Sequence, residues 1–88
     1  MIERAVMEHS QIRRLSAVEN GEKVRLVRVD AGRDLNRRLA SMGFVPNVQI
    51  TVVSNSHPGP FVIIVKEVKM VLGRGVAQKV LVEPEKSF

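Results

Sequence analysis

Apolar residues occupy every second position in two short segments of this 88-residue chain. Residues 48–52 read Val-Gln-Ile-Thr-Val and residues 68–72 read Val-Lys-Met-Val-Leu, and this two-residue period is typical of a strand with one buried face. Residues 24–29, Val-Arg-Leu-Val-Arg-Val, also alternate, but the phase slips between Leu26 and Val27. The slip predicts a β-bulge or a strand that is covered on both faces.

Two further apolar segments predict strands. Residues 61–65, Phe-Val-Ile-Ile-Val, form a continuous run after Pro60 and predict the central strand of a sheet. The short Lys66-Glu67 connection predicts a hairpin between this strand and residues 68–72, and residues 80–82 predict the last strand. Residues 54–60, Ser-Asn-Ser-His-Pro-Gly-Pro, are rich in turn formers and predict a loop.

A helical period appears in residues 34–42, where apolar side chains recur at i, i+4 and i+7. Asp34 is a favourable N-cap, and Gly43 can adopt the left-handed conformation that follows many helices. Pro46 prevents the helix from resuming. Because so short a helix is unstable alone, we expect its apolar stripe to be buried against strands. The stripe consists of Leu35, Leu39 and Met42.

Together these segments predict a mainly β fold, a small closed or nearly closed barrel of about five strands with one short helix after the first strand. A capping box at Ser16 and Glu19 predicts a further helical turn before that strand. We divide the chain into an N-terminal extension (1–14), a barrel domain (15–83) and a C-terminal tail (84–88).

A barrel of this size has room inside for only part of its β-branched apolar residues. We therefore expect some of them to be exposed. Exposed apolar surface or a free strand edge commonly marks a contact with a partner or a second copy. Burial of these residues beneath residues 1–14 is the alternative. The residues concerned are Val27, Val29, Val53, Val62, Ile64 and Val71.

The composition limits the setting of the protein. Cysteine is absent, which excludes disulfides and thiolate metal sites and is compatible with a reducing compartment. No apolar run approaches the roughly 20 residues of a membrane span, and residues 1–11 are too polar for the apolar core of a signal peptide. We therefore expect a soluble, cytoplasmic protein.

Basic residues outnumber acidic ones, fourteen Lys and Arg against nine Asp and Glu, and the net charge is +5. Nucleic acid or an acidic protein surface is therefore a candidate partner. Trp and Tyr are absent and only three Phe are present, so aromatic platforms for stacked bases are scarce. The densest basic cluster is Arg33, Arg37 and Arg38. We expect Arg38 to cover the core with its stem and to pair with a carboxylate or carbonyl.

The sequence contains no recognisable catalytic or metal-binding motif. His9 and His57 are the only histidines, without a His-x-x-His or Glu-x-x-His pair, so we expect no metal site and no cofactor. Residues 73–79 contain two glycines but lack the Gly-Lys-Ser/Thr ending of a phosphate loop. Because Ser, His and carboxylate residues show no catalytic spacing, we expect that the protein is not an enzyme.

Residues 38–46, Arg-Leu-Ala-Ser-Met-Gly-Phe-Val-Pro, resemble the Arg-Leu-x-x-Met/Leu-Gly-[Leu/Phe/Ile]-x-Pro-Gly core of the FeoA family. Members of this family are small cytosolic accessory proteins of bacterial ferrous iron uptake, and they have an SH3-like barrel fold. Residues 48–53, 60–61 and 77–83 also match the family pattern, and the resemblance covers residues 15–83. Four positions depart from the pattern: Asn47, Gly59, Glu67 and Gly73.

The resemblance implies a non-catalytic protein that contacts the membrane G-protein transporter of ferrous iron. A small basic nucleic-acid-binding barrel, the SH3-like domain of an iron-dependent repressor and a homo-oligomer remain alternatives. The repressor alternative requires a helix-turn-helix segment, for which the 33 residues before the central helix leave no room. We expect the partner to contact Arg33, Arg37, Arg38, Asn55, His57, Pro58, Val62 and Ile64.

Overall fold

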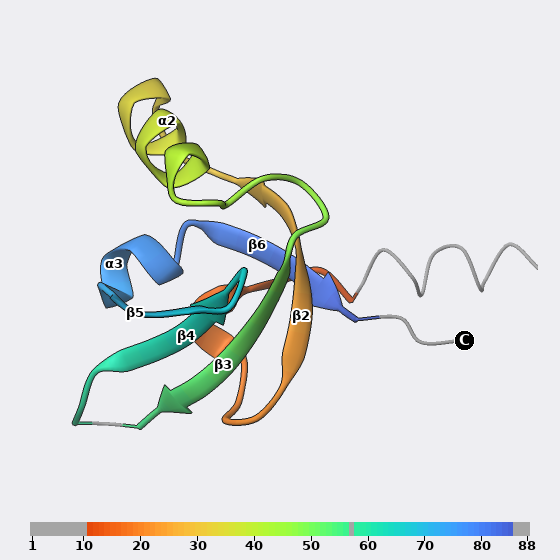
Figure 1. Cartoon of the computed structure of the whole chain (residues 1–88), viewed down its shortest axis with the longest axis vertical. Coiled ribbons are helices and arrows are strands. Elements are labelled where there is room, and N and C mark those ends of the chain that lie inside the picture. Colours follow the sequence, from red (N-terminus) through yellow and green to blue (C-terminus); the bar gives the residue numbers. More distant parts are fainter. Residues whose placement is uncertain (1–10, 57, 86–88) are drawn as a thin grey trace, which may run out of the picture.

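The computed structural model describes residues 11–56 and 58–85. Six antiparallel strands form one sheet with the order β1-β6-β2-β3-β4-β5, which curls into a small barrel (Figure 1). The predicted mainly β barrel is thereby confirmed, with six strands in place of about five. The strands are β1 (Arg13–Arg14), β2 (Lys23–Val29), β3 (Gln49–Asn55), β4 (Phe61–Val65), β5 (Val68–Leu72) and β6 (Val80–Pro84).

The additional strand is β1, which pairs with β6 through Arg13 opposite Val82 and Arg14 opposite Leu81. The strands therefore begin two residues before, and end one residue after, the limits 15 and 83 that we expected for the barrel. Three short helices connect the strands: η1 (Leu15–Ala17), α2 (Arg33–Ser41) and α3 (Arg74–Ala77).

Two irregularities bend the sheet. The pairing of β2 with β6 shifts between Leu26 and Arg28, which confirms the bulge that the slipped alternation predicts. The pairing of β3 with β4 shifts between Val52 and Ser54, which the sequence did not indicate. Because a bulge increases local twist, both help the sheet to close on itself.

The position of β4 differs from the expectation. It lies between β3 and β5, one strand from the edge of the sheet, and not at its centre. Its side chains alternate: Phe61, Ile63 and Val65 are buried, whereas Val62 and Ile64 are only half-buried. The continuous apolar run therefore combines a core-facing row with a second apolar row on the outer surface of the barrel.

Helix α2 begins two residues earlier than the predicted N-cap at Asp34 implies. Gly32 occupies the N-cap position, so Asp34 lies in the first turn. No side chain caps the N-terminus of α2; instead, Asn36 Nδ2 donates to the carbonyl oxygens of Ala31 at 2.7 Å and Gly32 at 3.1 Å. This holds the turn from β2 against the first turn of the helix.

As predicted, α2 is stopped by Gly43, which follows the C-cap residue and has φ of 101°. The Gly43 N–H donates to the Ala40 carbonyl at 3.0 Å, and the Phe44 N–H donates to the Leu39 carbonyl at 2.9 Å, the pair of bonds of a Schellman motif. Met42, however, is 47% exposed. The prediction that it is buried is wrong because the helix ends at Ser41, and Met42 lies in the turn, off the helical stripe.

The interior of the barrel is apolar, and no polar or charged side chain of the described residues is buried. Helix α2 contributes Leu39 and lies at one end of the barrel (Figure 1). The predicted capping box is wrong: η1 has no side-chain cap, and the Glu19 N–H donates to Glu22 Oε1 at 3.2 Å. Because the interior of the barrel offers no polar side chain to a ligand, any binding by this part of the chain takes place on its surface.

Candidate partner-binding site

One outer face of the sheet is apolar where β3, β4 and β5 lie side by side. Val62 pairs with Val71, and Ile64 is in register with Lys69 on one side and Thr51 on the other, so these side chains share a face. Val71 is 67% exposed. This confirms that some β-branched residues are exposed. We use the name outer apolar face for Val53, Val62, Ile64 and Val71.

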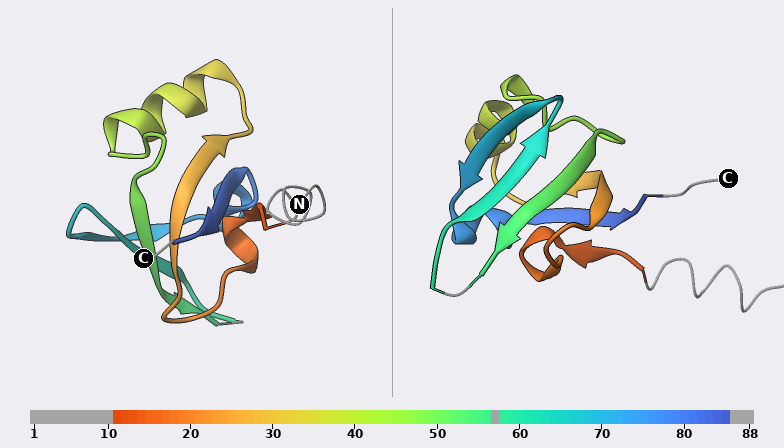
Figure 2. Two further views of the ribbon diagram at one scale, coloured as in Figure 1. Left: turned by 90° about the vertical axis from the view of Figure 1, so that its right-hand side faces the viewer. Right: turned by 60° about the horizontal axis from the view of Figure 1, so that its bottom comes forward.

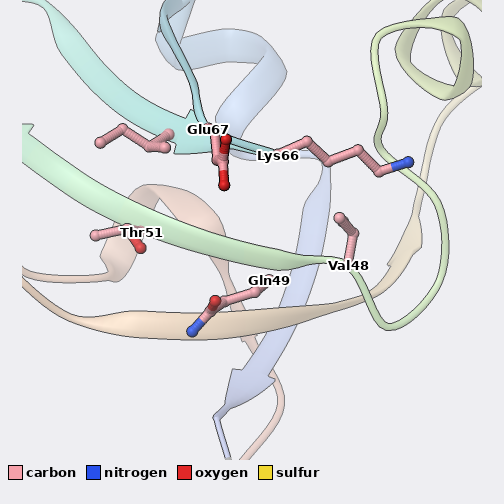
Figure 3. A pocket seen from close by; sticks show the side chains of 6 residues that line it. Val48, Gln49, Thr51, Lys66 and Glu67 are labelled. Atoms are coloured by element: carbon pink, nitrogen blue, oxygen red, sulfur yellow. The ribbon is translucent and has the colours of Figure 1, made fainter.

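A recess of about 260 Å³ adjoins this face at the tip of the β4–β5 hairpin. Figure 3 shows Lys66 reaching from the hairpin tip over Val48, toward the turn that follows α2. Both polar and apolar side chains line the recess, which therefore offers hydrogen-bonding groups beside the outer apolar face. Its lining consists of Val48, Gln49, Thr51, Ile64, Lys66 and Glu67.

A second, larger groove of about 500 Å³ lies between the end of α2 and the same hairpin. Met42 and Val68 are its most exposed apolar residues, at 47% and 56%. Lys66 lines both hollows. We use the name helix–hairpin groove for the hollow that is lined by Ala40, Ser41, Met42, Gly43, Val65, Lys66, Val68 and Met70.

The hairpin tip itself is strained. Lys66 has φ of 52° and Glu67 has φ of 67°, as a two-residue type I′ turn requires, but neither residue is the Asn, Asp or Gly that such turns prefer. A left-handed conformation costs an ordinary residue roughly 1–2 kcal/mol. Strain of this kind is concentrated at functional sites, and here both residues line a recess of the surface.

Asn55, at the end of β3, makes bonds within the fold with both ends of its side-chain amide. Its Nδ2 donates to the carbonyl oxygens of Ser16 at 3.0 Å and Val18 at 2.8 Å, and its Oδ1 accepts from Arg74 Nη1 at 2.7 Å. Its backbone N–H donates to Asn20 Oδ1 at 2.6 Å. Asn55 therefore fixes the loop between β3 and β4, and its amide is already committed to these bonds.

Arg74, the first residue of α3, completes this arrangement. Its Nη2 donates to the carbonyls of Ser56 at 2.8 Å and Gly59 at 3.1 Å, and its guanidinium lies 5.7 Å from the centre of the Phe61 ring. Sequence reasoning missed Arg74 because its partners are 13 to 19 positions away, and no local motif joins them. The loop is thus a braced structure at one end of the barrel.

The residues expected to contact a partner fall into three places. Arg33, Arg37 and Arg38 are exposed on α2 at one end of the barrel. The end of β3 with Asn55, and the loop after it with Pro58, lie at the opposite end (Figures 1 and 2). Val62 and Ile64 lie between them on the outer face of β4. His57 lies outside the described residues.

No arginine of α2 takes part in the ion pairs of residues 11–56 and 58–85, which involve Arg13 and Arg25. Arg38 is exposed, and its backbone carbonyl accepts a hydrogen bond from Ser41 Oγ at 2.7 Å. The expected side-chain pairing of Arg38 is not among the contacts of this part of the chain.

Arg13 and Glu22 join β1 to the start of β2 by an ion pair. The hydrogen bond from the Arg13 guanidinium lowers the pKa of Glu22 below its usual value of 4.5, against the opposing effect of partial burial. The Glu19 N–H also favours the charged carboxylate. This pair belongs to the framework of the barrel, where it links β1 to the residue before β2.

Residues 11–56 and 58–85 contain neither a cluster of metal ligands nor a membrane-spanning helix. Within the described ranges, no three His, Cys, Asp or Glu side chains gather closely enough to hold a metal ion. His9 and His57 lie outside those ranges. Of the helices in the described part of the chain, none is both long and apolar enough to cross a membrane.

Comparison with known proteins gives consistent similarities. Residues 13–84 match the model of a family that is described as the FeoA domain. A protein of Methanocaldococcus jannaschii, described as an Fe(2+) transport protein A, is 36% identical over 69 residues, which cover 78% of this chain and 83% of the relative.

Solved structures agree. An iron uptake regulatory protein (FeoA) superposes with a TM-score of 0.72 at 30% identity, over 82% of this chain and 94% of that chain. FeoA of Stenotrophomonas maltophilia in complex with zinc, described as a prokaryotic SH3 domain protein, gives 0.69 at 24% identity, over 78% and 87%. The expected SH3-like barrel is confirmed.

Proposed function

Because the chain belongs to the FeoA family of ferrous iron transport accessory proteins, we propose that it works in the cytoplasm as a non-catalytic module that contacts the cytosolic G-domain of a membrane ferrous iron transporter. The contact surface consists of the outer apolar face and the helix–hairpin groove, which meet at the β4–β5 hairpin. The proposal concerns binding alone, with ferrous iron as the cargo of the transporter.

The observation that carries this proposal is the exposure of apolar side chains on both sides of one hairpin. Val71 on the outer apolar face is 67% exposed, and Val68 at the groove is 56% exposed. Exposed apolar surface of this kind commonly marks a protein contact. The strained turn at Lys66 and Glu67 joins the two surfaces, which supports a role for the hairpin in recognition.

Charge supports an acidic surface on the partner. The chain carries a net charge of +5, and α2 both lines the helix–hairpin groove and carries the exposed residues Arg33, Arg37 and Arg38. Cations at the rim of an interface mainly raise the association rate and make it sensitive to salt. We therefore expect the association rate with the G-domain to fall as ionic strength rises.

The test is calorimetric titration of the chain with the purified G-domain. Replacing Met42 by Gln and Val71 by Thr removes apolar contact from both surfaces, and we expect the double variant to bind roughly 10-fold more weakly, as loss of about 1.4 kcal/mol requires. Ile12→Thr changes another exposed apolar residue, 37% exposed, that lies next to β1 at the opposite edge of the sheet, and it should bind like the wild type.

Two results would contradict the proposal. One is equal affinity of the wild type, the double variant and the Ile12→Thr control. The other is the absence of binding to the G-domain together with salt-dependent binding of a single-stranded oligonucleotide at Arg33, Arg37 and Arg38, which would favour the nucleic-acid alternative.

A further inference from the structure

Strand β5 is an edge of the sheet, since within the described residues it pairs only with β4. Figure 2 (right) shows β5 outermost, beside β4 and β3. Its pairing with β4 runs without a register shift from Val68 to Leu72, and the strand contains no proline. Bulges, prolines and charged side chains are features that blunt an edge against further pairing, and of these β5 has only the charge of Lys69. The edge of β5 therefore has few of the features that prevent strand addition.

The hairpin determines which backbone groups of β5 face outward. Its two-residue turn makes Val65 and Val68 a hydrogen-bonded pair. Antiparallel ladders alternate between hydrogen-bonded and non-hydrogen-bonded pairs, so Met70 and Leu72 also bond toward β4. The N–H and C=O groups of Lys69 and Val71 consequently point away from β4, to the free edge.

The side chains of β5 determine which residues an added strand would contact. Lys69 and Val71 lie on the outer surface, in register with Ile64 and Val62. Val68 and Met70 line the helix–hairpin groove on the other side. Val71 and Val68 are the two most exposed large apolar side chains in the described part of the chain. A strand that paired here would therefore need apolar residues on both faces and a negative charge opposite Lys69.

We propose that β5 is a docking strand for an extended, acidic segment of the partner, which adds to the sheet in antiparallel orientation. The segment has the pattern apolar-apolar-acidic-apolar, placed opposite Val71, Met70, Lys69 and Val68 in that order. Strand addition of this kind takes affinity from main-chain hydrogen bonds and specificity from alternate side chains. The inference rests on the proposed contact with a transporter and identifies the chemistry that the contact recognises.

Charge favours this occupant over a second copy of the chain. Two copies would each bring a net charge of +5. The outward groups of Lys69 and Val71 permit self-pairing centred on Lys69, which places two lysines opposite each other. Self-pairing centred on Met70 or on Val71 places Lys69 opposite Val71 or Gly73, so neither Lys69 meets an acidic residue. Like charges directly opposite are destabilising, whereas an acidic segment neutralises Lys69.

The test uses two synthetic peptides with blocked ends, Ser-Thr-Val-Val-Glu-Val-Thr-Ser and the same peptide with Lys in place of Glu. Binding is followed by NMR of the labelled protein together with amide hydrogen exchange. We expect the Glu peptide to bind more tightly and to slow exchange at Lys69 and Val71 by at least roughly 10-fold, since new ladder bonds protect these amides. Val68, Met70 and Leu72, which already bond to β4, should change little.

Two variants make the test specific. Lys69→Glu should reverse the preference, from roughly 3-fold in favour of the Glu peptide to roughly 3-fold in favour of the Lys peptide, as expected for cross-strand charge pairs. Val71→Pro removes an N–H that the β4 ladder does not use, so the protein should remain folded by NMR but lose peptide binding. Val71→Thr keeps the N–H and should retain the exchange pattern at reduced affinity.

The inference is overturned if the peptides shift residues elsewhere without protecting Lys69 and Val71, or if Lys69→Glu leaves the preference unchanged. Protection of these two amides that rises with protein concentration in the absence of peptide would identify a second copy as the occupant and also overturn it. If Val71→Pro binds the G-domain as tightly as the wild type, docking at β5 is refuted while the proposed contact function stands. A wild-type chain that does not bind the G-domain refutes the contact function itself.

Discussion

Arg74 Nη1 donates a hydrogen bond of 2.7 Å to Asn55 Oδ1, and this bond joins the start of α3 to the end of β3. The same guanidinium holds the Ser56 and Gly59 carbonyls, so a single side chain closes the loop between β3 and β4. The loop therefore acts as part of the barrel framework. These bonds fix the start of β4, where Val62 of the outer apolar face lies.

Replacing Arg74 by Lys should test this role. Lysine keeps the positive charge but cannot bond the Asn55 side chain and two carbonyls with one planar group. We expect the free energy of unfolding to fall by about 1–3 kcal/mol, measured by urea denaturation, with faster amide exchange in the loop. Gln49→Ala, at an exposed site on the same strand as Asn55, should change stability by less than about 0.5 kcal/mol. Equal effects of the two substitutions would contradict the bracing role.

The chain offers a matched pair of glycines for a test of the α2 terminus. Gly43 has φ of 101°, and an added Cβ would lie 3.4 Å from Lys66 Cδ, whereas Gly75 in α3 has open space around it. We expect Gly43→Ala to lower the free energy of unfolding by about 1–2 kcal/mol. Gly75→Ala should raise it by about 0.5–1 kcal/mol because alanine is the better helix former. Thermal unfolding measures both changes. If the two substitutions shift the free energy of unfolding in the same direction, the assigned conformations are contradicted.

The hairpin tip predicts a conflict between stability and binding. Changing Lys66 to Asn and Glu67 to Gly introduces the preferred type I′ pair, and relief of the positive-φ strain should raise the free energy of unfolding by about 1 kcal/mol. The same change removes two side chains that line the surface hollows. We expect weaker binding to the G-domain from a more stable protein. A variant that gains stability and keeps full affinity would show that the tip does not contact the partner.

The pair formed by Arg13 and Glu22 predicts a pH dependence. Its hydrogen bond lowers the pKa of Glu22 in the folded state, so the stability that it contributes is present above the ordinary pKa near 4.5 and is lost as pH falls through the folded-state pKa. Above pH 5, Glu22→Gln should lower the free energy of unfolding by no more than roughly 1 kcal/mol, because the pair is partly exposed and screened by solvent. The stabilities of the two proteins, measured from denaturation curves, should converge as pH falls through the folded-state pKa of Glu22, and stabilities that diverge there would contradict the assignment.

Local patterns in the sequence were sufficient to predict most elements. The glycine stop of α2, the slip at Leu26 and the Lys66-Glu67 hairpin are properties of a few neighbouring residues. Such features require no knowledge of the rest of the fold.

Features that depend on distant residues could not be predicted in this way. The apolar composition of β4 is the same for a central strand and for a strand whose second apolar row is exposed, and only the pairing order distinguishes them. The bond of Asn55 with Arg74 joins residues 19 positions apart. Similarly, Arg37 and Pro58 both carry plausible surface chemistry, but the sequence does not show that the barrel places them at opposite ends.

The most direct measurement is an NMR titration of the labelled wild-type chain with the G-domain of a ferrous iron transporter. If the contact occurs as proposed, amide shifts will concentrate at the β4–β5 hairpin and around Met42, with exchange protection at Lys69 and Val71. No shift at saturating G-domain, or shifts confined to β1 and α3, would contradict a contact at the outer apolar face and the helix–hairpin groove.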